Sequence, residues 1–158
     1  MIGEILVRRC VDGDLAMLEM NEPPNSGIAR TFLQHQTAGS IVYAAAWRGD
    51  RVMGTVVLDL TSEYTPELKH LFVEEAARNE GAGTALCTWM ENHAVRAGFR
   101  KLYLGVGVEN DRARNLYDRL GFQPSGRASA TTYLYVDDSG EKQWVTETND
   151  ILEKRLAT

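Results

Sequence analysis

One stretch of the chain has residue types and a spacing suited to binding a phosphate group. It lies between an apolar run and a predicted helix, and it holds seven consecutive residues: Arg78, Asn79, Glu80, Gly81, Ala82, Gly83 and Thr84. The first turn of a helix leaves backbone N–H groups unpaired at the positive end of the helix dipole. The two glycines lack a Cβ, which lets their amides approach a ligand closely, and the guanidinium suits phosphate oxygens. We interpret this stretch, called the cradle below, as a pyrophosphate-binding site.

Other phosphate-binding motifs can be compared with the same residues. A dinucleotide fingerprint needs a third glycine at the position of Leu86, and a P-loop needs a lysine directly after Gly83. Neither residue is present, so both motifs are excluded. From the cradle alone, a tight strand-to-helix turn without a ligand remains an alternative.

A second segment, 110–122, combines a capping residue with an amphipathic helix. Asn110 is suited to the N-cap of a helix predicted over 111–120, and Gly121 is suited to ending it. Tyr117 lies on the apolar stripe of that helix. For an arbitrary helix, the simplest interpretation of such a tyrosine is a core-facing aromatic residue.

The two segments together resemble a known family. Arg78-x-x-Gly81-x-Gly83 after a strand resembles the acetyl-CoA signature of the GCN5-related N-acetyltransferase (GNAT) superfamily. The segment 110–122 resembles the second signature of that superfamily, an Asn followed by a helix with a Tyr before Gly-Phe. The resemblance is strongest over about 58–123, and the N-terminal third and the C-terminus match only in outline.

The resemblance implies a fold and a cosubstrate. The fold is α+β, with a mostly antiparallel sheet of six to seven strands, parallel and splayed fourth and fifth strands, and about four helices. A β-bulge near 71–73 would free backbone groups for the pantetheine arm of acetyl-CoA. The residues expected to bind acetyl-CoA are Leu71, Phe72, Val73, the seven cradle residues, Asn110, Asn115 and Tyr117.

The reaction implied is acetyl transfer from acetyl-CoA to an amine by direct attack in a ternary complex. Tyr117 would protonate the leaving thiolate, and a backbone N–H near Val73 would polarise the thioester carbonyl. Glu67 is the first candidate for the general base, because histone-type members carry a base glutamate in a comparable place. His70 is the second, since imidazole titrates near neutral pH. The alternative function is a CoA-binding module without transferase activity.

The acceptor amine is not specified by the sequence. A small-molecule amine is the first expectation, and an antibiotic, a polyamine, an amino acid, a protein N-terminus or a lysine all remain open. The loop 21–27, with two prolines, is our candidate for an acceptor-side lid. Five acidic residues either form a mouth for a cationic amine or are simply solvated: Glu22, Asp59, Glu63, Glu67 and Glu109.

Composition narrows the class of protein further. The 158 residues suit one domain, 1–158, and the net charge of −5 without a basic stripe argues against a nucleic-acid partner. The start, 1–10, fits neither a signal peptide nor a membrane span. Two cysteines distant in sequence and three scattered histidines argue against a metal site. A cytoplasmic location is the default expectation, and a homodimer is expected only at the level of the family.

The remaining elements follow from periodicity and turn residues. Strands are predicted at 4–9, 40–48, 51–60, 67–73, 101–108, 131–136, 143–148 and 151–156. Helices are predicted near 15–20 and over 28–36, 83–97 and 111–120. Gly49-Asp50 predicts a hairpin turn, and Gly54 predicts a bulge or a close backbone approach.

Overall fold

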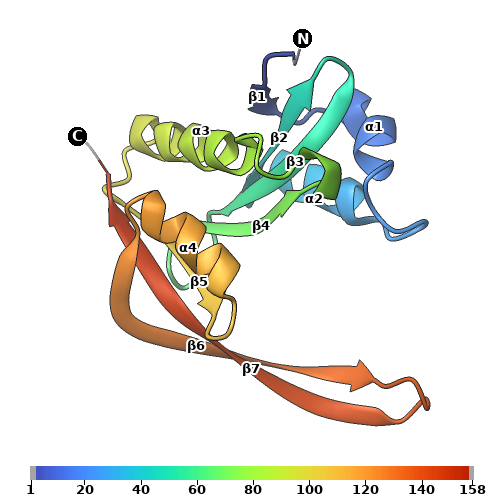
Figure 1. Ribbon diagram of the computed structural model, residues 1–158, viewed down its shortest axis with the longest axis vertical. Helices are drawn as coiled ribbons and strands as arrows, with labels where there is room; N and C mark the ends of the chain where they lie inside the picture. Colours follow the sequence, from blue (N-terminus) through green and yellow to red (C-terminus); the bar gives the residue numbers. More distant parts are fainter. Residues whose placement is uncertain (1–2, 157–158) are drawn as a thin grey trace. The chain divides into compact units, whose positions relative to one another are not determined.

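The computed structural model describes residues 3–156, which form a mixed α+β fold (Figure 1). The strands are β1 (Leu6–Arg9), β2 (Ile41–Arg48), β3 (Arg51–Asp59), β4 (Glu67–Val73), β5 (Lys101–Gly107), β6 (Gln123–Val136) and β7 (Lys142–Arg155). The α-helices are α1 (Leu15–Glu19), α2 (Ile28–Thr37), α3 (Ala82–Arg96) and α4 (Asp111–Arg119), with short 3-10 helices η1 (Asp12–Asp14) and η2 (Glu75–Ala77).

The strands form one seven-stranded sheet in the order β1-β2-β3-β4-β5-β7-β6. β1 to β4 pair antiparallel, as do β6 and β7, whereas β4 and β5 are parallel. The predicted α+β class is therefore confirmed. The chain divides into two compact units, residues 1–102 with 155–158 and residues 103–154, and each unit is described separately here.

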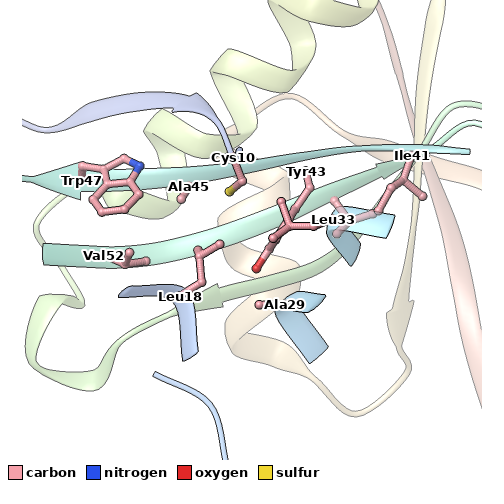
Figure 2. Close-up of a cluster of buried hydrophobic side chains, with 10 residues drawn as sticks. Cys10, Leu18, Ala29, Leu33, Ile41, Tyr43, Ala45, Trp47 and Val52 are labelled. Atoms are coloured by element: carbon pink, nitrogen blue, oxygen red, sulfur yellow. The ribbon is translucent and has the colours of Figure 1, made fainter. Parts of the chain in front are cut away.

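The first unit is built on the β2–β3 hairpin, which turns at Gly49 and Asp50 as predicted. All residues of β2 from Ile41 to Trp47 are buried, because helices cover both faces of this strand. α1 and α2 lie on one face and α3 on the other (Figure 1). Alternate residues of β2 pack with Leu18, Ala29 and Leu33 of α1 and α2 into one apolar cluster (Figure 2).

β4 carries a β-bulge. Thr55 of β3 pairs with Phe72, and Val57 pairs with Lys69, so two residues of β4, His70 and Leu71, oppose a single residue of β3. His70 has a left-handed backbone, with φ of 54°. The bulge predicted near 71–73 is confirmed, and it begins one residue earlier.

Gly54 of β3 explains how the two strands fit together beside this bulge. A Cβ at Gly54 would lie 2.4 Å from the carbonyl oxygen of Phe72. The close backbone approach that the sequence predicted at Gly54 is therefore present. It requires glycine at this position, since no larger residue fits without a shift of β4.

α3 shows the predicted amphipathic pattern and the predicted C-terminal cap. Leu86, Met90 and Ala94 are buried along one face. Gly98 has φ of 92°, and the amide of Phe99 donates to the carbonyl of Ala94 at 3.0 Å. This Schellman-type ending fixes the direction in which the chain enters β5.

In the second unit, β6 and β7 form one long hairpin that differs from the prediction (Figure 1). Two short strands and a separate closing strand were expected, but β7 is continuous from Lys142 to Arg155 and β6 begins at Gln123. The physical reason lies at 124–126. β6 is an edge strand, which tolerates Pro124, and a register shift between Pro124 and Arg127 absorbs Ser125 and Gly126.

In the described residues, no helix has the length and apolar character required to span a membrane.

Candidate functional site

The cradle predicted from the sequence forms the uncapped N-terminus of α3. Asn79 and Gly81 adopt left-handed backbone conformations, with φ of 66° and 92°, and this turn starts α3 at Ala82. The amide of Ala85 donates to the carbonyl of Gly81 at 3.0 Å, which closes the first turn. No side chain of the described residues caps the helix. The amides of the first turn are therefore positioned to bind an anion.

The charged side chains of the cradle are oriented by neighbouring strands. Arg78 is exposed, and its Nε donates to the carbonyl of Val73 at the end of β4 at 3.3 Å. Glu80 forms an ion pair of 3.0 Å with Arg48 at the end of β2. Because this pair holds the Glu80 carboxylate, Glu80 can serve an anionic ligand at the cradle only through its backbone.

A cavity of about 410 Å³ lies in the same unit. Its lining residues come from α1, the α1–α2 loop, α2 and three strands: Leu18, Asn21, Glu22, Pro23, Ile28, Phe32, Tyr43, Val52, Thr55, His70, Leu71 and Phe72. Asn21 anchors the loop, because its side-chain amide donates to the carbonyl of Val52 at 2.8 Å. The loop 21–27, predicted as a lid, thus contributes part of the cavity wall. Cavities that are mostly apolar with a few convergent polar groups are typical small-molecule sites.

Two of the polar lining residues, Glu22 and Tyr43, come from the loop and from β2. Glu22 accepts a hydrogen bond at Oε2 from the amide of Ala29 at 3.1 Å, whereas its Oε1 is buried without a hydrogen-bond partner among the described residues. Burial, together with the nearby Cys10 and Glu22, raises the pKa of Tyr43 well above its usual value. Tyr43 projects from β2 toward the helices (Figure 2). Its phenol is therefore neutral at physiological pH.

The bulged strand places His70 in the wall of the cavity. Its ring lies against Phe32, with ring centroids 5.1 Å apart. Partial burial and the neighbouring Lys69 lower the pKa of His70, against an opposing effect of Asp59 and Glu67. The residue is nevertheless open to solvent on one side, so its desolvation is incomplete. A neutral imidazole in a cavity wall can accept a proton.

Glu67, the other candidate base, is placed differently. It is half-buried at the start of β4, accepts a hydrogen bond from the Ser62 hydroxyl, and is not among the lining residues of the cavity. The structure thus brings His70 into the cavity and leaves Glu67 outside its wall.

Of the five acidic residues predicted to form a mouth, all but Glu22 are absent from the lining of the cavity. Asp59 is paired with Lys69 at 2.8 Å, and Glu63 and Glu109 are exposed. Glu22 alone of these five carboxylates lines the cavity.

Among the described residues, no three His, Cys, Asp or Glu side chains are grouped in a way that would hold a metal ion.

The second unit contains the predicted residues of α4. Asn110 is the N-cap, as predicted, and its side-chain oxygen accepts from the amide of Ala113 at 3.2 Å. Tyr117 is half-buried and packs edge-on against Phe122, with ring centroids 6.0 Å apart. Asn115 is exposed. Tyr117 therefore packs as expected for a core-facing aromatic residue, and only part of its surface is accessible.

Sequence reasoning missed several residues of the cavity wall. Phe32, Tyr43 and Thr55 come from separate elements, and each reads in sequence as an ordinary core position. The only local signal was the loop with two prolines. It predicted one segment that borders the cavity, but it did not identify the other residues of the wall.

The geometry thus combines an uncapped helix N-terminus, a bulged strand and an apolar cavity in one unit of an α+β protein. Comparison with known proteins identifies its family. The model of the acetyltransferase (GNAT) family matches residues 14–122. The chain belongs to this family.

Relatives by sequence agree with this assignment, and similar solved structures share the fold. Probable N-acetyltransferase 14 of Xenopus tropicalis is 31% identical over 61% of this chain and 48% of its own length. The chain spans from 25% to 48% of the length of the relatives that it matches in sequence. An N-acetyltransferase of Staphylococcus aureus has a TM-score of 0.72 at 14% identity, covering 98% of this chain and 100% of that chain. A GNAT family acetyltransferase of Elizabethkingia anophelis with acetyl-CoA bound has a TM-score of 0.66 at 20% identity, covering 96% of this chain and 98% of that chain.

Proposed function

We propose that this protein is an N-acetyltransferase that moves an acetyl group from acetyl-CoA to an amine. The observation that carries the proposal is the uncapped N-terminus of α3, which follows the bulged strand β4 and the short helix η2. The family membership of the chain and the acetyl-CoA bound to the Elizabethkingia relative support it. A non-catalytic CoA-binding module is the alternative.

The residues of the first unit suit the two chemically distinct parts of acetyl-CoA. The amides of Ala82, Gly83 and Thr84 would bind the pyrophosphate, together with the exposed guanidinium of Arg78. The backbone of 71–73, beside the bulge, would pair with the pantetheine arm. When bound, acetyl-CoA supplies an activated acyl group as a thioester.

The amine must lose a proton in order to attack the thioester carbon. We propose His70 as the base that accepts this proton, directly or through a water molecule. Its place in the cavity wall and its lowered pKa support this role. Glu67 remains the second candidate, because a water chain can connect a more distant carboxylate to the amine.

The remaining steps stabilise the intermediate and release the thiol. A backbone N–H near Val73 would donate to the oxygen of the tetrahedral intermediate. As the C–S bond breaks, Tyr117 would give its proton to the sulfur, and the hydroxyl later regains a proton from solvent. A phenol hydroxyl can give a proton to a leaving thiolate, as this role requires. Asn110 and Asn115 are proposed to contact the cosubstrate, as the family resemblance implies.

We also propose a cellular setting and an assembly. Cys10 is a buried free thiol, which supports a cytoplasmic location. The family match spans 14–122 and so includes parts of both compact units, which supports one catalytic domain over 1–158. Exposed apolar side chains of the β6–β7 hairpin, with Trp144 74% exposed, support a homodimer. Light scattering with size exclusion measures that state, and a monomer at all concentrations would contradict the homodimer.

The activity is tested by thiol release from acetyl-CoA with a panel of amines, in wild type and in Tyr117→Phe. We expect the variant to lose roughly 100-fold or more in kcat, because it cannot protonate the thiolate. The affinity for acetyl-CoA should change much less than kcat, because phenylalanine keeps the aromatic ring of Tyr117. Tyr103→Phe, which removes another half-buried hydroxyl of the same unit, is the matched control. Binding of acetyl-CoA without thiol release for any amine would instead favour the CoA-binding module.

A further inference from the structure

The cavity beside the bulge has a wall with very little charge. Among the described residues, those that line it include neither lysine nor arginine, and Glu22 is the only aspartate or glutamate. The other polar lining residues are Asn21, Tyr43, Thr55 and His70. The first three are uncharged, and the lowered pKa of His70 favours its neutral form. Glu22 therefore carries the formal charge of this wall.

The carboxylate of Glu22 is used by the fold. Its Oε2 accepts from the amide of Ala29, in the first turn of α2, at 3.1 Å. Its Oε1 is buried, with less than 1 Å² of accessible surface. A carboxylate at a helix N-terminus is stabilised by the helix dipole. An occupant of the cavity thus meets no carboxylate oxygen that is both accessible and without a partner.

The exposed part of the wall is apolar apart from the proposed base. Four lining residues are exposed, namely Pro23, Ile28, His70 and Phe72. Ile28 and Phe72 are large apolar side chains, each 42% exposed. A ligand that covers them removes apolar surface from water, which is favourable. An amine close enough to give its proton to His70 brings its substituent to this apolar wall.

We infer that the acceptor is a primary amine on an alkyl or aralkyl group, without a second charge, and that this group occupies the cavity. The inference rests on the proposed function for the reacting amine. The volume of about 410 Å³ lies within the range of roughly 300–1,000 Å³ for small-molecule sites. A second ammonium or a carboxylate would lose hydration there without gaining an ion pair, which is unfavourable. Polyamines and zwitterionic amino acids are therefore poor acceptors.

The experiment measures kcat/KM by thiol release from acetyl-CoA with propylamine, hexylamine and 1,5-diaminopentane. Hexylamine and the diamine have the same number of non-hydrogen atoms and differ in the charge at the far end. We expect hexylamine to exceed propylamine at least tenfold, because burial of one methylene contributes about fourfold in affinity. We expect hexylamine to exceed the diamine at least tenfold as well. The wild-type chain alone decides these two comparisons.

Two variants test whether the alkyl group lies in this cavity. Ile28→Glu adds a carboxylate to the wall at the first residue of α2, where the helix dipole favours an acidic side chain. Met17→Glu is the matched control, because Met17 is 41% exposed on α1 and does not line the cavity. We expect Ile28→Glu to reduce the preference for hexylamine over the diamine at least tenfold and Met17→Glu to keep it.

Other outcomes overturn the inference and leave the acetyltransferase proposal intact. These are equal kcat/KM for hexylamine and the diamine, or no gain from propylamine to hexylamine. A preference for hexylamine that a folded Ile28→Glu keeps at its wild-type value would show that the alkyl group binds elsewhere. Faster transfer to propylamine from hexanoyl-CoA than from acetyl-CoA would assign the cavity to the acyl chain instead.

Failure of the proposed function is recognised separately, by calorimetry of amine binding with CoA present. If no amine causes thiol release but hexylamine binds at least tenfold more tightly than the diamine, the cavity keeps its assignment and the transferase is contradicted. Equal binding of the two amines, without thiol release, would contradict both.

Discussion

At the scale of single residues, His70 gives the clearest link between backbone geometry and chemistry. Its left-handed φ of 54° creates the bulge, and the same bulge puts its ring into the cavity wall against Phe32. A residue other than glycine in this conformation is uncommon and strained. Strain of this kind is often found at functional sites, which supports the choice of His70 over Glu67.

The pH dependence of activity tests this choice. Because the pKa of His70 is lowered, the imidazole becomes able to accept a proton at a pH below its ordinary value of about 6.5. We expect kcat/KM to rise with pH through an inflection below that value, in addition to any inflection of the amine itself. His70→Gln should remove this inflection and lower kcat/KM about 100-fold or more.

The control for this prediction is His35→Gln, on the exposed side of α2, which should keep the wild-type profile. The stability of the fold must be followed in the same window. Unfolded His70 binds a proton more tightly than folded His70, so this residue lowers the free energy of unfolding as pH falls below about 6.5. An unchanged inflection in His70→Gln, measured where the variant remains folded, would identify another base, with Glu67 the next to test.

At the scale of elements, the contact between β3 and β4 fixes the shape of the site. Gly54 allows the two strands to approach, because even a Cβ there would lie 2.4 Å from the Phe72 carbonyl. Phe72 and Leu71 both line the cavity and precede the cradle. A shift of β4 would therefore disturb the cavity and the expected pantetheine contacts together.

We predict that Gly54→Ala lowers the free energy of unfolding by about 1–3 kcal/mol, as overpacking typically does, and also weakens acetyl-CoA binding. Denaturant unfolding and calorimetry measure the two effects. Gly13→Ala is the control, because a Cβ there meets no atom within 4 Å. Equal stability of Gly54→Ala and wild type would show that β4 moves away without cost, contrary to the rigid contact described here.

Most helices and hairpins of the fold could be predicted from local sequence, for identifiable reasons. Apolar periodicity located α3, Gly98 ended it, and Gly49-Asp50 placed the β2–β3 turn. The continuous β6 strand was missed because Pro124 to Gly126 is a breaker by composition. Only the edge position of β6 and its bulge make that sequence acceptable in a strand.

The candidate site was predictable only in part, for the same physical reason. The cradle is a local motif, so its turn and helix start follow from neighbouring residues. The cavity is assembled from elements distant in sequence, and Tyr43 or Phe32 carries no sign of it. The choice between Glu67 and His70 as the general base also depended on the bulge, because the bulge determines which of the two side chains lies in the cavity wall.

At the scale of the whole molecule, the central claim is that the N-terminus of α3 binds the pyrophosphate of acetyl-CoA. A ligand at 100 times its Kd adds about 2.7 kcal/mol to the free energy of unfolding. For a protein of this size, each kcal/mol raises Tm by about 2–4 °C. The size of the expected shift is therefore well within the range of a thermal unfolding experiment.

The most direct measurement compares thermal shifts with acetyl-CoA, CoA, NAD and ATP in wild type, Gly83→Trp and Asn92→Trp. Gly83 lies in the first turn of α3, whereas Asn92 is exposed further along the same helix. We expect acetyl-CoA and CoA alone to raise the Tm of wild type and of Asn92→Trp, and Gly83→Trp to lose this shift. Stabilisation by NAD or ATP instead, or no shift with either CoA species, would contradict the account and leave the cradle a tight turn.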